Sequence, residues 1–218
     1  MSYLLRVVLP DRPGMLGAVA TAIGRAGGDI VSLDVVERGP GGAVDDLLVV
    51  VPPGGLADAL LTSAQSVEGV VVESIRPHHG ATDLRGDLEL VEELAAAPGD
   101  GLALLADRAP GVFRAGWAVL VACAPDGPGT RVLAASPSAP DLAGLALPWL
   151  PLASARRMDP EEPWVPPRWE ALATELAAAP VGRPDRVVLL GRPGGPRFRQ
   201  SEVLRLAHLA GILATVSG

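Results

Sequence analysis

The chain of 218 residues contains no lysine and no asparagine, and all 18 of its basic residues are arginine. The missing lysine excludes Schiff-base catalysis, a catalytic lysine base and the lysine of a phosphate-binding P-loop. The only cysteine is Cys123, so no intramolecular disulfide can form, which favours a reducing, cytoplasmic setting. Aromatic residues make up 3% of the chain, so leucine, valine and alanine must fill its cores.

Positive charge and long apolar runs are also scarce. The net charge is −7, whereas proteins that bind nucleic acid carry basic stripes. The sequence has no uncharged apolar run of about 18 residues, the length that a membrane-spanning helix needs. It also begins without a basic segment leading into an apolar stretch. We therefore expect no nucleic-acid partner, no membrane span and no signal peptide.

The first 77 residues predict a small α+β domain. Alternating apolar residues indicate strands at 3–9, 29–38, 45–51 and 70–76, and helical spacing indicates helices after Pro13 and after Gly55. This β-α-β-β-α-β order is the ferredoxin-like arrangement, an antiparallel sheet with both helices on one face. The other face carries leucine and valine, which predicts that a second copy of the chain covers it.

Residues 78–86 contain His78, His79, glycine and threonine, and we interpret them as a linker. Residues 87–218 predict a second domain. Its pattern favours helices at 87–97, 101–109, 169–179 and 201–216 and strands at 117–123, 131–135 and 186–190. A proline-rich section, 137–167, has no clear period.

The most informative residues border the first helix. Asp11-Arg12-Pro13-Gly14-Met15-Leu16 leads into it, and Gly28-Asp29-Ile30 follows it. The first N–H groups of a helix have no internal partner and lie at the positive end of the helix dipole, where a ligand carboxylate is favoured. Gly14 allows close approach to the backbone, and Asp11 and Asp29 can accept hydrogen bonds from an ammonium group. The same residues also suit a purely structural role, in starting a helix and following a turn.

These segments, in this order of elements, resemble the ACT domain family, whose loop-and-helix signature is similar to DRPGML…GGDIVSLDV. The resemblance covers residue 3 to about residue 77. It implies a regulatory domain that dimerises and binds an amino acid at the interface. Asp11 matches a ligand-contact position of the family, and Asp29 stands where several amino-acid-binding members have asparagine. The expected ligand-binding residues are Asp11, Arg12, Pro13, Gly14, Met15, Leu16, Asp29 and Ile30.

The second half resembles GAF domains. The segment GWAVLVACAPDGPGTRVLAAS is similar to their opening hairpin, and VVLLGR followed by Phe198 and the last apolar helix is similar to their closing strand and helix. The resemblance covers about residues 87–216 and implies a central antiparallel sheet. It also implies a domain that binds a small molecule or dimerises. The motif of cyclic-nucleotide binders requires lysine and asparagine and is therefore missing.

No catalytic, metal or cofactor site is expected. Cys123 lies within an apolar strand, and the neighbouring His78 and His79 lack zinc-site spacing. We therefore expect a cytoplasmic regulatory protein, a homodimer or higher oligomer that binds an amino acid and passes the signal through its second domain. The alternative is an enzyme, such as a hydrolase, with its site at 137–167, for which turnover lost on mutating Asp159 or Glu161 would be the evidence.

Overall fold

The computed structural model divides the chain into two compact units, residues 1–84 and 85–218, called here the N-terminal and C-terminal units. It describes residues 1–78, 86–124 and 129–216.

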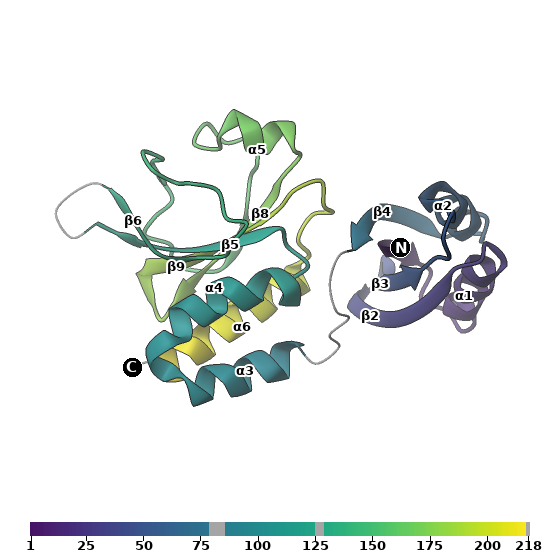
Figure 1. Ribbon diagram of the computed structural model, residues 1–218, viewed down its shortest axis with the longest axis horizontal. Coiled ribbons are helices and arrows are strands. Elements are labelled where there is room, and N and C mark those ends of the chain that lie inside the picture. Colours follow the sequence, from purple (N-terminus) through teal and green to yellow (C-terminus); the bar gives the residue numbers. More distant parts are fainter. Residues whose placement is uncertain (79–85, 125–128, 217–218) are drawn as a thin grey trace. The chain divides into compact units, whose positions relative to one another are not determined.

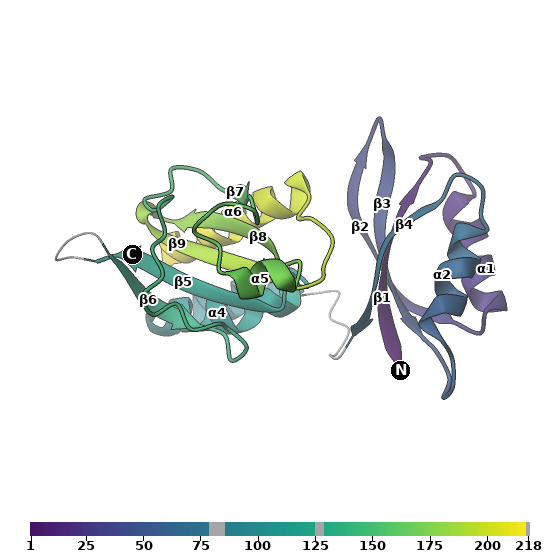
Figure 2. The same cartoon turned by 90° about the horizontal axis from the view of Figure 1, so that it is seen from above.

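The N-terminal unit has the predicted order of elements. They are β1 (Ser2–Leu9), α1 (Met15–Arg25), β2 (Asp29–Gly39), β3 (Gly42–Val50), α2 (Ala57–Gln65) and β4 (Val71–His78). The strand order is β2-β3-β1-β4, with every neighbouring pair antiparallel. Both helices cover one face of the sheet (Figure 2). This is the ferredoxin-like α+β fold that the periodicity indicates.

Alternation along β1 fills the core between sheet and helices. Leu5, Val7 and Leu9 face the helices and are at most 3% exposed. The end of α1 packs tightly on the sheet at Gly28, because a Cβ there would come within 2.8 Å of the Ile23 and Leu60 side chains. The close approach explains why glycine follows this helix.

The opposite face of this sheet is less apolar than the sequence pattern indicates. It carries Leu4 and Leu48, as expected, but also a buried ion pair. The Arg6 guanidinium donates to both carboxylate oxygens of Asp46, over 2.7 and 2.8 Å, and the two residues face each other on β1 and β3. Such a bidentate ion pair fixes the register of the two strands and neutralises both buried charges.

The C-terminal unit is also α+β. Its elements are α3 (Gly86–Ala96), the short 3₁₀ helix η1 (Pro98–Asp100), α4 (Gly101–Val112), β5 (Trp117–Cys123), β6 (Thr130–Ala135), β7 (Arg156–Met158), α5 (Pro167–Ala171), β8 (Glu175–Val181), β9 (Arg183–Arg192) and α6 (Gln200–Val216). Five strands form an antiparallel sheet in the order β6-β5-β9-β8-β7. Figure 1 shows α3, α4 and α6 on one face of this sheet, with α5 on the other.

The β5, β8 and β9 strands of the C-terminal sheet are buried on both faces. Alternate residues of β5, such as Leu120, pack against α3, α4 and α6. The intervening residues, such as Val119, pack against residues 142–169, which include Trp149, Trp164 and Trp169. The proline-rich section thus has a structural role, as the cover of one sheet face.

One predicted helix is wrong, and two strands, β7 and β8, are absent from the sequence prediction. Residues 169–179 were expected to be a single helix, but α5 ends at Ala171 and β8 runs from Glu175 to Val181. Alanine favours a helix locally, yet Ala177, Ala178 and Ala179 lie in β8, which pairs with β7 on one side and β9 on the other. Their small side chains fit between two packed layers, and Pro180 stands at a register shift. The strand β7 has three residues, too few for a periodic pattern.

Candidate functional site

The loop between β1 and α1, residues 10–14, is the exposed feature on which the predicted site depends. Asp11, Arg12, Pro13 and Gly14 are all exposed. Gly14 is the N-cap of α1 with φ of 89°, the left-handed region that favours glycine, and nothing lies within 4 Å of where its Cβ would be. The helix starts at Met15, so Pro13 precedes the cap.

The first turn of α1 leaves two amides open. Ala18 N–H donates to Gly14 O over 2.9 Å, and Met15 N–H reaches Arg12 O at a long 3.4 Å. Within the described part of the chain, the N–H groups of Leu16 and Gly17 have no hydrogen-bond partner, and α1 has neither a capping side chain nor an acidic residue in its first turn. Both residues are exposed. This is the arrangement that favours an anion at a helix N-terminus.

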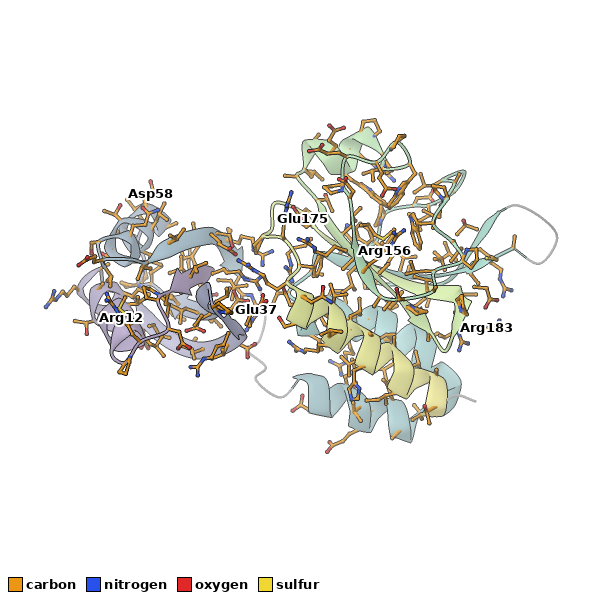
Figure 3. The ribbon with its side chains drawn as sticks, turned by 180° about the vertical axis from the view of Figure 1, so that it is seen from behind. Arg12, Glu37, Asp58, Arg156, Glu175 and Arg183 are labelled. Carbon is orange, nitrogen blue, oxygen red and sulfur yellow. The ribbon has the colours of Figure 1, made fainter. Side chains whose placement is uncertain are left out.

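Met15 attaches this end of the helix to the core. Its side chain is 8% exposed and packs with the residues that fill the space under the helices. Arg12, labelled in Figure 3, folds back so that its Nε lies 3.3 Å from the Met15 sulfur. Met15 is therefore a packing residue of the loop, while Leu16 is 37% exposed beside it.

Asp29 and Ile30 lie at the other end of the unit. Asp29 faces Val50 on β3, and Val50 also faces Ser2, the first residue of β1. The loop, in contrast, follows Leu9, the last residue of β1. The seven residue steps from Ser2 to Leu9 separate Asp29 from the start of the loop by about 23 Å along β1. Within one copy, Asp29 therefore does not complete a pocket with Asp11.

An acid that the sequence analysis did not identify, Asp45, lies at the same end as the loop. It pairs with Val7 of β1 and Val35 of β2, on the helix-covered face. It is 2% exposed, and its Oδ1 has no hydrogen-bond partner in the described part of the chain. Burial raises the pKa of Asp45, and nearby Asp46 and Asp11 add to this effect, while Arg38 opposes it. The sequence indicates this residue by one feature alone, a carboxylate within a run of apolar strand residues.

Comparisons with known proteins identify the N-terminal unit. Residues 3–69 match the family model of the ACT domain. The N-terminal unit is an ACT domain. None of the curated proteins compared with the chain matches it.

Solved structures similar to the chain include GAF domains. The GAF domain of an Acinetobacter phosphoenolpyruvate-protein phosphotransferase is 12% identical, with a TM-score of 0.45 over 64% of this chain and 94% of its own. The GAF domain of a putative sensor histidine kinase from Pseudomonas syringae pv. tomato is 20% identical, with a TM-score of 0.45 over 60% and 82%. A free methionine-R-sulfoxide reductase from Neisseria meningitidis, in complex with its substrate, is 16% identical, with a TM-score of 0.48 over 65% and 95%.

Aromatic side chains fill one layer of the core of the C-terminal unit. All four tryptophans gather on one face of its sheet. Ring centroids are 4.9 Å apart for Trp117 and Trp169, 6.3 Å for Trp164 and Trp169, and 5.6 Å for Trp149 and Trp164. Each is at most 8% exposed. The tryptophans thus pin residues 142–169 to the core, as aromatic side chains of this size do.

The acids of the 137–167 section make local contacts in the described structure. Asp159 and Glu161 are exposed, and Asp159 accepts a hydrogen bond from the Glu161 amide over 3.0 Å, a local turn contact. A hollow of about 470 Å³ between β6 and residues 141–146 has, among the residues that the structure describes, Asp141 as its only charged lining residue. That carboxylate accepts from the amide of Ala143 over 2.9 Å.

Two further observations concern the described residues alone. Among residues 1–78, 86–124 and 129–216, no group of three or more histidine, cysteine, aspartate or glutamate side chains is arranged to hold a metal ion. Over the same ranges, no helix has both the length and the apolar character needed to cross a membrane.

Proposed function

We propose that this protein is a non-catalytic regulator in which the ACT domain senses an amino acid at the interface of two copies. An ACT domain indicates a regulatory, ligand-binding protein. The observation that carries the finer proposal is the exposed loop with Gly14 in the left-handed region and two unpartnered amides behind it, at Leu16 and Gly17. These amides suit the ligand carboxylate.

Two copies are needed because the two predicted halves of the site lie at opposite ends of β2. This strand forms one edge of the sheet, and it carries two exposed valines, Val31 at 45% and Val35 at 44%. A long, apolar edge strand is a template for pairing with another strand. Asp29 begins β2 and Arg38 lies near its end. Antiparallel pairing of two β2 edges would bring Asp29 of one copy to Arg38 and the loop of the other, matching opposite charges across the two-fold axis.

The C-terminal unit is proposed to pass the signal on, as a GAF-like domain that dimerises or contacts a further partner. We propose no cofactor, no nucleic acid and no turnover of the ligand. A cytoplasmic setting is part of the proposal, since one cysteine cannot form an intramolecular disulfide.

The test is a thermal-shift screen of the full chain with each of the twenty amino acids, combined with gel filtration at micromolar concentration. A ligand present at 100 times its Kd should stabilise the ACT domain by about 2.7 kcal/mol. Val31→Arg should produce monomers and remove the shift, because a charge on the β2 edge blocks pairing. A wild-type monomer, or no shift with any amino acid, would refute the proposal.

Mixed dimers test whether the site is shared between copies. Asp11→Ala and Asp29→Ala should each abolish binding in a homodimer. When the two variants are mixed and allowed to exchange, half of the dimers combine them, and each combined dimer has one site with both acids intact. Binding should then return to about a quarter of all sites. A site built within one copy would show no recovery.

A further inference from the structure

The buried carboxylate of Asp45 has no structural partner that explains its position. Asp45 lies on β3 opposite Val7, which is two residues before the end of β1 and so about 7 Å from the start of the loop. Its strand partner on the same face, Val7, belongs to the apolar core. Burying an ionised carboxylate without a hydrogen bond is costly, and proteins normally pair such a group or replace it. The unpartnered Oδ1 of Asp45 is therefore an acceptor that a cationic ligand group can use.

The charges that face Asp45 leave it without an ion-pair partner. Arg38, on β2, is close enough to lower its pKa, yet among the described residues the two side chains form no ion pair. Asp11 from the loop and Asp46 from the same strand both add negative charge. Asp46 is already engaged by Arg6 on the opposite face of the sheet. The surroundings of Asp45 are thus short of positive charge, which favours a ligand cation.

The first turn of α1, at the same end of the sheet as Asp45, is held by few hydrogen bonds. The first turn of α1 lacks a capping side chain, and the Met15 amide contact to Arg12 O is 3.4 Å long. Met15 lies at the same end of the same layer as Asp45, and its sulfur is held from outside by the exposed Arg12. A small displacement of this turn would uncover the carboxylate while keeping the open amides of Leu16 and Gly17 beside it.

We propose that Asp45 is a specificity-determining residue that receives the ammonium group of the ligand when the first turn of α1 moves aside. The inference rests on the proposed function and adds to it an acceptor within the same copy as the open amides. A molecule with both a carboxylate and an ammonium group fits, with its carboxylate on the amides and its ammonium on Asp45. The corresponding 2-hydroxy acid, which lacks the cation, is excluded because it would leave the buried carboxylate unpaired.

The test compares the full chain with Asp45→Asn and with Asp58→Asn as the matched control, an exposed acid in the first turn of α2. Each is titrated by calorimetry with the amino acid that gives the largest thermal shift in the wild type, and with its 2-hydroxy analogue. Asp45→Asn should weaken amino-acid binding about 10- to 100-fold, since a hydrogen bond to a charged group is lost. Asp58→Asn should bind as the wild type does, and the 2-hydroxy acid should not bind detectably.

The outcomes separate this inference from the proposed function. If the wild type binds an amino acid and Asp45→Asn binds it equally well, the role of Asp45 is refuted while the sensing function stands. If the wild type binds no amino acid, both are refuted. Loss of binding in a folded Asp45→Asn whose melting temperature without ligand is not lowered supports the inference, because a merely structural acid would not separate these two effects.

A second measurement needs no variant. Binding of an ammonium group favours the ionised form of Asp45, so a protonated Asp45 must release its proton when the ligand enters. Titrations in two buffers of different ionisation enthalpy should show proton release on the acid side of neutrality, and affinity should fall as the pH falls. Binding that releases no protons and is independent of pH between 4 and 7 would overturn the inference.

Discussion

Replacing Arg192 by methionine should severely destabilise the C-terminal unit. The Arg192 side chain is fully buried, and its guanidinium donates to Phe113 O over 2.6 Å, to Pro196 O over 3.0 Å and to Arg114 O over 3.2 Å. It also donates to Glu202 Oε1 over 2.6 Å. One side chain therefore joins the end of α4, the turn after β9 and the start of α6.

The magnitude follows from what the substitution leaves behind. Methionine keeps much of the volume but removes the ion-pair partner of the buried Glu202, whose other oxygen still accepts from the Arg199 amide over 2.7 Å. It also removes the donor of three carbonyl groups. Removing one partner of a buried ion pair costs about 3–5 kcal/mol. For a unit of this size, such a loss lowers the melting temperature by roughly 10–20 °C. The cation–π contact, with the Arg192 Cζ 3.8 Å from the Phe198 ring centroid, is lost as well.

The assay is tryptophan fluorescence during urea unfolding, because all four tryptophans lie in the C-terminal unit and none in the ACT domain. Arg183→Met is the matched control. Arg183 pairs with Asp185 over 3.1 Å, but the two side chains are 64% and 42% exposed, so its loss should change the free energy of unfolding by less than about 0.5 kcal/mol. Figure 3 marks its position on the hairpin between β8 and β9. A free energy of unfolding for Arg192→Met within about 1 kcal/mol of the wild type would refute the reasoning.

Three further predictions concern the ACT domain, and circular dichroism measures each. Gly14→Ala should lower the free energy of unfolding by about 1 kcal/mol, because Gly14 has a positive φ. Gly17→Ala, within α1, should raise it by about 0.5–1 kcal/mol. Equal effects of the two substitutions would contradict the left-handed cap. Gly28→Ala should lower the free energy of unfolding by about 1–3 kcal/mol, since its Cβ would lie 2.8 Å from the Leu60 side chain. An unchanged free energy of unfolding would show that the end of α1 has space for a methyl group. Asp45→Asn should stabilise the domain at pH 7 by about 1 kcal/mol. The pKa of Asp45 is higher in the folded than in the unfolded chain, so the free energy of unfolding of the wild type falls as the pH rises from the unfolded to the folded pKa. The stabilisation by Asp45→Asn must therefore shrink in acid, where Asp45 is protonated. A stabilisation that does not change with pH would exclude ionisation of Asp45 as its cause.

The sequence by itself determined the ACT fold and the position of its loop. Alternation in residues 3–9 and helical spacing from Leu16 to Ile23 are local patterns, and each matches the burial that the structure shows. The Gly14 conformation and the open amides also follow from local sequence, because a helix always leaves its first N–H groups unpaired. The same logic located most elements of the C-terminal unit, including β5 at its observed residues.

Only the tertiary structure decided which distant residues meet. Residues 175–181 became a strand because they pair with β7 and β9, which outweighs the helical preference of alanine. Asp29 was separated from Asp11 because β2 starts where β1 starts, so the helix between them spans the whole length of the sheet. Asp45 entered the candidate site through strand register alone. Local propensity acts over a few residues, whereas burial and electrostatic environment depend on contacts between strands far apart in the chain, which a sequence pattern does not specify.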